Sequence, residues 1–311
     1  MGAVADGNFS GKRLVVLGCG DLGGAVAREG LRRGMRVTAL TRNESAADEL
    51  RADGIGVVVT DLADAAWHAE IPGGADLVLN AVSSGGGGVE GYRRSYVEGM
   101  RSVLQWMRER GRAGTFVYTS STSVYSQGGA VRVSEESERE TAGEPEHASG
   151  RYEKRTVLRE AERLVRENAG ACARWFVLRL AGLYGPGRTH LIEQVCAGEI
   201  AGRGKHHLNL IHRDDAAAAI WAAFGAPENV ADEVFNVADD RPAPKSEVAL
   251  WLAQRLGVPA PVFTGEPAAG RTAVTPDRVI ANDRIKRVLG WAPRHPSYRE
   301  GYENVLAGGA K

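Results

Sequence analysis

RLVVLGCGDLG, at residues 13–23, begins as a short apolar run and passes directly into a glycine-rich turn. In such a turn Gly18 permits the tight bend, Gly20 lets a pyrophosphate approach the backbone, and Gly23 lets the next helix lie close to the strand. Unpaired N–H groups at the start of that helix, expected over 24–33, bind phosphate with the help of the helix dipole. The stretch therefore predicts a strand, a dinucleotide-binding turn and a helix; the alternative is a turn with only a structural role.

Short apolar segments recur along the chain and alternate with helical patterns. Strands are expected at 14–17, 36–40, 56–60, 77–81, 115–119, 176–180 and 234–237. Continuous apolar runs of this kind are typical of strands that are covered on both faces. Helices are expected between them, for example over 97–110 and 152–168. The alternation predicts an α/β fold, a Rossmann-type doubly wound parallel sheet with right-handed crossovers.

The rest of the chain predicts a smaller C-terminal substrate lobe. Residues 183–210 and 239–311 hold most of the prolines and are expected to form it, whereas 1–182 and 211–238 form the dinucleotide-binding domain. Residues 126–150 are polar and glycine-containing. They are expected to form either an excursion over the ligand face or a solvated loop.

Charge and cysteine content argue against several classes of function. Lys+Arg and Asp+Glu number 39 each, so no net field draws the 311-residue chain to nucleic acid or to an anionic membrane. Cys19, Cys172 and Cys196 have the spacing of neither disulfides nor metal ligands, as in a reduced intracellular protein. No apolar signal stretch or membrane span is evident. We expect a cytoplasmic protein with a small-molecule substrate and with no metal, nucleic-acid or membrane partner.

The end of the second expected strand bears on the choice of dinucleotide. An acid there binds the ribose 2′-hydroxyl of NAD, whereas an arginine accommodates the 2′-phosphate of NADP. This chain has Thr41 and Arg42, which favour NADP, while Glu44 keeps NAD open. Asp61, which follows the third strand, is expected either to contact the adenine or to cap the next helix. The predicted cofactor-binding residues are Gly18, Gly20, Asp21, Leu22, Gly23, Thr41, Arg42, Asp61, Leu62, Ala81 and Val82.

Four further motifs follow the turn in sequence. They are SSTSVY at 120–125, RLAGLYGPG at 179–187, IHRDD at 211–215 and FNV at 235–237. They resemble the S-S-x-x-V-Y-G, R-x-x-x-x-Y-G-P-G, I-H-V-D-D and Y-N-V of the extended short-chain dehydrogenases/reductases, the nucleotide-sugar epimerase/dehydratase group. The order is also that group's, across nearly the whole chain. The first loop is G-x-G-x-x-G rather than G-x-x-G-x-x-G, which points to the atypical branch of epimerase-like proteins.

The resemblance implies hydride transfer by a Ser or Thr, a Tyr, and a Lys four residues after the Tyr. In that arrangement the phenol exchanges a proton, a nearby ammonium lowers the pKa of the phenol, and the serine holds the substrate oxygen. The matching serine is Ser121, which could instead cap the end of a strand. The Tyr-x-x-x-Lys pair is not preserved, because counting from Tyr152 places Thr156 at the lysine position.

A second register of the same helix takes Glu162 as the family's acid. It places Lys154 at the tyrosine position and Leu158 at the lysine position. An apolar stripe at 157, 158, 161, 164 and 165 favours this register, with Lys154 at the top of the stripe and Tyr152 exposed. The candidate catalytic residues are Ser121, Tyr152 and Lys154, with Tyr118 and Tyr125 as further phenols.

Basic side chains gather around the expected junction of the two parts. They are Arg188, His190, Arg203, Lys205, His206, His207, His212 and Arg213. Such a cluster suits an anionic substrate such as a nucleotide sugar, and the alternative is that 203–207 forms a solvated turn. The predicted substrate-binding residues are Ser83, Tyr184, Arg188, His190 and His212.

These patterns predict an NADP-linked oxidoreductase or epimerase that acts on a hydroxyl or carbonyl of a polar, anionic metabolite. Two alternatives stay open. One is a non-catalytic sensor or regulator that reads NADP occupancy, and the other is a redox-neutral isomerase or lyase that reuses the cofactor cleft. By resemblance, helices 97–110 and 152–168 are expected to form a homodimer interface, unless Leu104, Trp106 and Met107 belong to the core.

Overall fold

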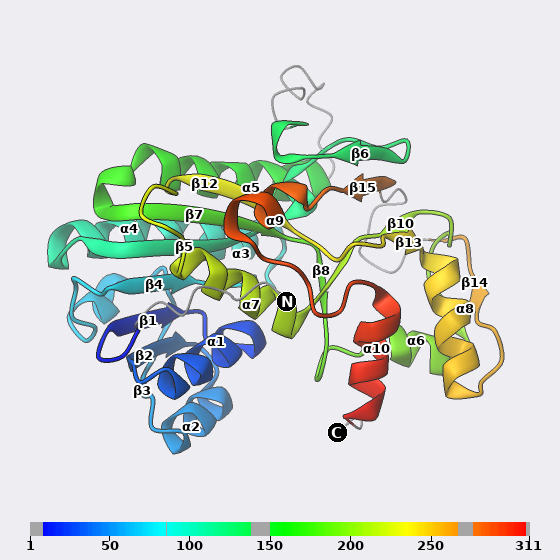
Figure 1. The fold of residues 1–311 in the computed structure, drawn as a ribbon, viewed down its shortest axis with the longest axis horizontal. Coiled ribbons are helices and arrows are strands. Elements are labelled where there is room, and N and C mark those ends of the chain that lie inside the picture. Colours follow the sequence, from blue (N-terminus) through cyan, green and yellow to red (C-terminus); the bar gives the residue numbers. More distant parts are fainter. Residues whose placement is uncertain (1–8, 85, 138–149, 267–275, 309–311) are drawn as a thin grey trace.

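The computed structural model describes residues 9–84, 86–137, 150–266 and 276–308, and for 150–152 it describes the backbone only. Its main feature is a seven-stranded parallel sheet in the order β12-β7-β5-β4-β1-β2-β3 (Figure 1). The strands are β1 (Arg13–Leu17), β2 (Arg36–Thr41), β3 (Gly56–Val59), β4 (Leu77–Asn80), β5 (Ala113–Ser121), β7 (Cys172–Leu180) and β12 (Glu233–Val237). All seven predicted strands are confirmed, and with them the Rossmann-type α/β fold.

Alternate residues of the strands supply two separate cores. Leu14 and Val16 of β1 belong to one hydrophobic cluster, whereas Val15 and Leu17 belong to the other. The first is covered by α1 (Asp21–Arg32), α2 (Glu44–Ala52), α7 (Arg213–Phe224) and α9 (Asp283–Leu289). The second is covered by α4 (Gly99–Arg110) and α5 (Gly150–Glu167). Both faces are buried, which explains why the strand sequences are apolar without alternation.

A small lobe lies beside the sheet, built around α6 (His190–Cys196), α8 (Lys245–Leu256) and α10 (Tyr298–Ala307) (Figure 1). Its helices share a hydrophobic cluster of their own, which includes Ile200, Leu252 and Tyr302. Three strand pairs accompany them: β8 (Gly182–Tyr184) with β11 (Leu210–His212), β9 (Glu199–Ile200) with β14 (Val262–Phe263), and β10 (His207–Leu208) with β13 (Ala243–Pro244).

One segment that the sequence assigned to the lobe packs elsewhere. β15 (Arg278–Ile280) pairs with β6 (Val131–Val133), and the side chains of Ile280, Ile285 and Trp291 join the cluster on the large sheet. Proline content indicated where loops lie, but it did not indicate which core an apolar side chain joins. Residues 278–291 therefore pack on the sheet rather than with α6, α8 and α10.

The helix expected over 97–110 begins earlier and has three parts. α3 (Gly88–Arg93) leads into the π-helical turn η2 (Arg94–Glu98), which continues as α4. Leu104, Trp106 and Met107 are buried in the protomer's own core, and the Trp106 indole donates to the carbonyl of Ile71 at 2.9 Å. Of the two alternatives for these three residues, the structure supports the one in which they belong to the core.

The remaining described elements are short. They are η1 (Ala65–His68), η3 (Thr122–Val124) and η5 (Ala169–Ala171). Cys19 and Cys172 are buried as free thiols, and Cys196 is exposed. Within the described ranges, every helix is too short or too polar to cross a bilayer.

Candidate active-site cleft

A cleft of about 510 Å³ opens at the carboxyl ends of the parallel strands. Its walls come from the loops after β1, β2, β3 and β4, from the end of β5 and from η2. Every residue predicted to bind the dinucleotide lines it. Open α/β sheets bind ligands at this edge, where the strand order reverses on either side of β1.

The β1–α1 turn has the shape that a pyrophosphate needs. Gly18 has a φ of +87°, and a Cβ built on it would lie 2.5 Å from the backbone nitrogen of Val82. A Cβ at Gly23 would lie 2.4 Å from the Gly18 carbonyl oxygen. In contrast, a Cβ at Gly20 would have no atom within 4 Å, so space is open before the start of α1. This leaves room for a phosphate beside the N–H groups of the first turn of α1.

Charged side chains converge on Asp61 at the β2–β3 end of the cleft. Asp61 Oδ2 lies 3.8 Å from Arg42 Nη1 and 3.1 Å from Arg94 Nε, and its Oδ1 accepts from the backbone of Ala63 at 2.9 Å. Burial opposes ionisation of Asp61, but Ala63 N–H and the Arg94 guanidinium outweigh it and hold the pKa below its ordinary value. Asp61 therefore both lines the cleft and caps the turn after β3. Arg94 was not foreseen, since the helix was expected to begin after it.

The predicted catalytic positions are not gathered at the cleft. Ser121 Oγ accepts from Ser123 N at 3.1 Å, which is the capping contact considered as its alternative role. Lys154 is exposed rather than at the top of the apolar stripe, and its Nζ lies 5.6 Å from the ring centroid of Tyr92. The side chain of Tyr152 lies outside the described residues. The stripe itself is confirmed, because four of its five residues are buried and Leu164 is partly buried.

A buried polar network joins β5, α5, β7 and β12 beneath the cleft. Glu162 and Arg179 are both fully buried and pair through two contacts of 2.6 and 3.0 Å. Ser120, which lines the cleft, donates to Glu162 at 2.6 Å. Tyr125 OH accepts from Arg179 at 2.9 Å and donates to Asn236 at 2.7 Å. Burial raises the pKa of Tyr125 to about 12, so its proton stays within this network.

Two of the predicted substrate residues line the cleft. Ser83 does so at the end of β4, and Arg188 donates from its Nε to Asp21 Oδ2 at 2.8 Å. Arg213 reaches the same carboxylate at 3.0 Å. His190 is exposed on α6 and does not line the cleft.

Tyr184 and His212 are corrections to the predicted substrate set, because both are packed inside the protein. The Tyr184 ring lies 4.6 Å from that of Tyr302 in the core of the small lobe. His212 caps the start of α7, where its Nδ1 accepts from Asp214 N at 3.3 Å. Neither side chain is accessible to a ligand.

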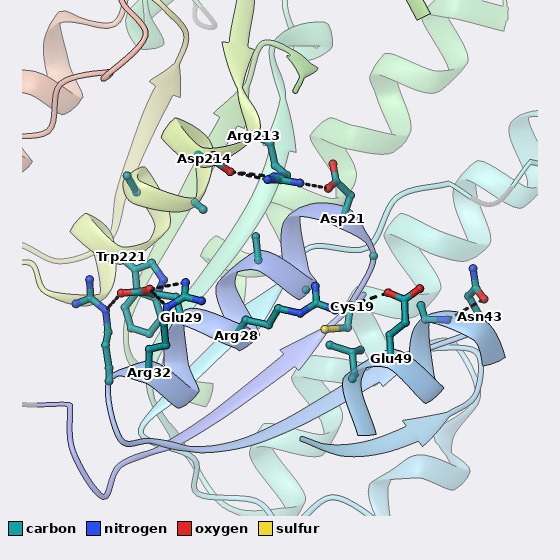
Figure 2. Close-up of a pocket in the computed structure, with 18 of the residues that line it drawn as sticks. Cys19, Asp21, Arg28, Glu29, Arg32, Asn43, Glu49, Arg213, Asp214 and Trp221 are labelled. Carbon is teal, nitrogen blue, oxygen red and sulfur yellow. Dashed lines mark hydrogen bonds and ion pairs between the residues drawn. The ribbon is translucent and has the colours of Figure 1, made fainter. Parts of the chain in front are cut away.

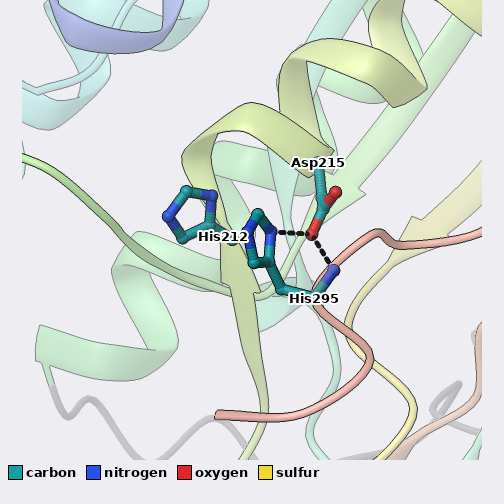
Figure 3. Close-up of side chains that lie close together, drawn as sticks. All are labelled: His212, Asp215 and His295. Carbon is teal, nitrogen blue, oxygen red and sulfur yellow. Dashed lines mark hydrogen bonds and ion pairs between the residues drawn. The ribbon is translucent and has the colours of Figure 1, made fainter. Parts of the chain in front are cut away.

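His212 also belongs to a close group with Asp215 and His295 (Figure 3). Asp215 accepts from His295 Nδ1 at 2.9 Å and from the backbone nitrogens of Arg294 and His295 at 2.8 and 3.0 Å. These bonds occupy both carboxylate oxygens. The IHRDD motif therefore serves to fasten the segment before α10 to the start of α7.

A larger hollow of about 940 Å³ lies on the other side of α1, between α1, α2 and α7 (Figure 2). Four of its five arginines are paired, for example Arg28 with Asp53 at 2.6 Å and Arg33 with Glu29 at 2.7 Å. Cys19 lies there too, and burial raises the pKa of its thiol to about 12. Paired charges and a protonated thiol leave fewer groups available to bind a ligand than the open glycine turn does.

Comparison with known proteins agrees with this geometry. The model of the family described as NAD dependent epimerase/dehydratase matches residues 14–238. Protein YeeZ of Escherichia coli (strain K12) is 28% identical over 296 residues, covering 92% of this chain and 97% of that protein. A 3-diazoavenalumate denitrifying reductase from Streptomyces sp is 35% identical over 159 residues. That match covers 47% of this chain and spans half the length of the reductase, 50%.

The fold recurs among solved structures. MoeE5, solved in complex with UDP-glucose and NAD, superposes with a TM-score of 0.77 at 21% identity. The match covers 95% of this chain and 97% of that one. At this level of identity the likeness shows the shared fold.

Proposed function

Because the chain belongs to the NAD-dependent epimerase/dehydratase family, we propose that it is an oxidoreductase or epimerase that uses NADP(H) at a carbonyl or hydroxyl carbon of a polar metabolite. The family confirms the resemblance predicted from the four motifs. The observation that carries the proposal is the cleft, since every residue predicted to bind the dinucleotide lines it. A bound nicotinamide supplies or accepts the hydride. The protein binds and orients the substrate and moves the proton.

The pair of arginines on Asp61 supports NADP rather than NAD. Arg42 lines the cleft and is 45% exposed, and Arg94, which is 51% exposed, reaches the same Asp61 carboxylate from η2. Two guanidiniums can share the oxygens of a 2′-phosphate, which NAD lacks. Glu44, the residue that kept NAD open, lies in α2 and does not line the cleft.

The cluster at Asp21 supports an anionic substrate. Arg188 and Arg213 both bind this carboxylate. Arg213 also pairs with Asp214 at 2.9 Å, so Arg188, which lines the cleft, is the cation of this group that a ligand can reach. Carboxylate or phosphate groups would be favoured there. A nucleotide sugar has such phosphates, and MoeE5, which shares the fold, is known in complex with UDP-glucose.

Thermal unfolding with NADP, NADPH, NAD and NADH tests the proposal. At 100 times Kd, a ligand that binds the folded state adds about 2.7 kcal/mol to the free energy of unfolding. The phosphorylated pair should raise Tm selectively, and Arg42→Ala should abolish the selectivity. Arg36→Ala, at the exposed start of the same strand, should retain it. No shift with any of the four nucleotides would refute a dinucleotide cofactor.

A regulator that binds NADP without turnover is the second candidate. It is favoured by the positions of Ser121 and Lys154, neither of which lines the cleft. Such a protein would bind NADPH and change its oligomeric state or its affinity for a partner. It would not consume NADPH with any carbonyl compound, which separates the two candidates.

A further inference from the structure

A tyrosine that the sequence analysis did not consider faces the cleft. Tyr96 lies in the π-helical turn η2 and lines the cleft together with Ser83 at the end of β4 and with Thr119 and Ser120 at the end of β5. Among the described residues of the lining, it is the sole phenol. A π-helical turn inside a helix is frequent at functional sites.

The other described tyrosines are engaged or enclosed. Tyr125 is held by Arg179 and Asn236, and Tyr118 is buried within the core. The three tyrosines of the small lobe, Tyr184, Tyr298 and Tyr302, belong to its hydrophobic cluster.

The Tyr96 ring packs against a second tyrosine, which in turn lies beside a lysine. The ring centroids of Tyr92 and Tyr96 are 4.5 Å apart, and Lys154 Nζ lies 5.6 Å from the Tyr92 centroid. α3 and η2 both pack against α5, the helix that carries Lys154. A phenol and a lysine, the two groups missing from the Tyr-x-x-x-Lys spacing, thus meet from two different helices.

We propose that Tyr96 is the catalytic proton donor of the cleft and that Tyr92 and Lys154 are positioning residues behind it. The assignment rests on the proposed hydride transfer. In carbonyl reduction, the substrate carbon gains a hydride while its C=O π pair forms a bond to the proton of Tyr96 Oη. The phenolate left on Tyr96 then takes a proton from water, so a carbonyl, a hydride and a proton yield one alcohol.

The surroundings of Tyr96 favour donation of its phenol proton. Burial raises the pKa of Tyr96, and hydrogen bonds from the Ser84 backbone and the Tyr92 side chain offset part of this rise. The phenol is therefore protonated at neutral pH. Tyr118 of β5 interacts with both Tyr92 and Tyr96, and Lys154 of α5 lies over the Tyr92 ring.

Fluorine NMR of the full chain labelled with 3-fluorotyrosine tests the assignment without a substrate. Tyr96→Phe identifies the Tyr96 resonance by its loss, and Tyr298→Phe in the small lobe identifies a control resonance. NADP⁺ places a positive ring charge next to a catalytic phenol, and a charge within about 4–6 Å lowers a pKa by about 1 unit or more. Followed by its fluorine shift over a pH titration, the pKa of Tyr96 should be about 1 unit lower with NADP⁺ than with NADPH.

The outcomes separate this assignment from the proposed function. If both nucleotides raise Tm but neither changes the pKa of Tyr96, the assignment is wrong while the dinucleotide cleft stands. If neither nucleotide binds, the proposed function fails and the assignment fails with it. Lys154→Met should raise the pKa of Tyr96 with NADPH binding unchanged, and an unchanged pKa would remove Lys154 from the positioning role.

Discussion

The two ends of the cleft are made from different parts of the chain. At the β1–α1 end, backbone forms the surface, because Gly18, Gly20 and Gly23 bring no side chains. At the β5–β7 end, side chains form the support, with Ser120 held by Glu162, which is held in turn by Arg179. The structure of the first end requires positions without side chains. The structure of the second end requires buried charges of opposite sign that pair with each other.

Because of this difference, the two ends are sensitive to different kinds of substitution. A backbone-lined turn fails when a Cβ is added, even though no interaction is removed. A buried ion pair fails when one partner is removed, because the other charge is left without compensation in a low-dielectric interior. Four substitutions can break or sharpen the comparison.

The largest effect is expected at the side-chain end. Glu162→Leu removes the carboxylate that makes two contacts with the buried Arg179 and should lower the free energy of unfolding by about 3–5 kcal/mol, measured by urea denaturation. Glu167→Gln breaks the exposed Arg163–Glu167 pair on the same helix and should cost less than about 0.5 kcal/mol. Equal losses in the two variants would contradict the role given to burial.

Asp239, just beyond β12, is another buried carboxyl, and the charges that act on it are those of other carboxylates. Burial raises its pKa to about 7, helped by Asp240, Asp215 and Glu300, and its Oδ2 has no hydrogen-bond partner among the described residues. The folded state therefore keeps a proton that the unfolded chain releases near pH ~4. Stability is lost as the pH rises through this window.

Asp239→Asn should remove that loss. At about pH 8 the variant should be more stable than the wild type by on the order of 3 kcal/mol, and at about pH 4 the two should be alike. Urea denaturation at both pH values is the measurement. A gain that is the same at both would show that ionisation of Asp239 is not the cause.

At the backbone end, Gly18→Ala should lower the free energy of unfolding by about 1–3 kcal/mol, because φ is +87° and the new Cβ meets Val82. Gly20→Ala is its matched control, since that Cβ would have no neighbour within 4 Å. It should fold with wild-type stability but weaken NADPH binding at least about tenfold, about 1.4 kcal/mol. Wild-type affinity in Gly20→Ala would show that no phosphate approaches this turn.

The smallest effect is expected at Arg94. Arg94→Ala removes one guanidinium from the Asp61 group and should raise the Kd of NADPH up to about tenfold, with the Kd of NADH little changed. Arg93→Ala is the neighbouring control, because Arg93 pairs with Glu160 at 2.8 Å rather than with Asp61. Calorimetric titration with both nucleotides measures the ratio. Equal weakening of both would place Arg94 away from the 2′-position.

Local signals were sufficient at the backbone end. A glycine at 18 with a strand before it and a helix after it requires this turn, because side chains cannot adopt its backbone or fit beside Val82. The positions of Thr41, Arg42 and Asp61 followed, since parallel strands bring their carboxyl ends to one edge. These residues lie together because each follows a strand that its own apolar sequence predicts.

Local signals failed where the site depends on which helix supplies a side chain. The spacing on α5 could not reveal that Tyr92, from the preceding helical segment, lies beside Lys154 and packs against Tyr96. A glycine-rich stretch before 90 concealed the helix start. Likewise, the basic cluster around 188–213 did not show that His212 is enclosed while Arg188 reaches the cleft.

The sequence by itself determined the seven-stranded Rossmann sheet, the family and the edge at which the dinucleotide residues meet, because turn geometry and strand burial are written in neighbouring residues. Only the tertiary structure decided which charges are paired, which histidines are buried and which phenol faces the cleft. Those outcomes depend on contacts between residues far apart in the chain, such as Glu162 with Arg179 and Tyr125 with Asn236. Spacing along one helix carries no information about them.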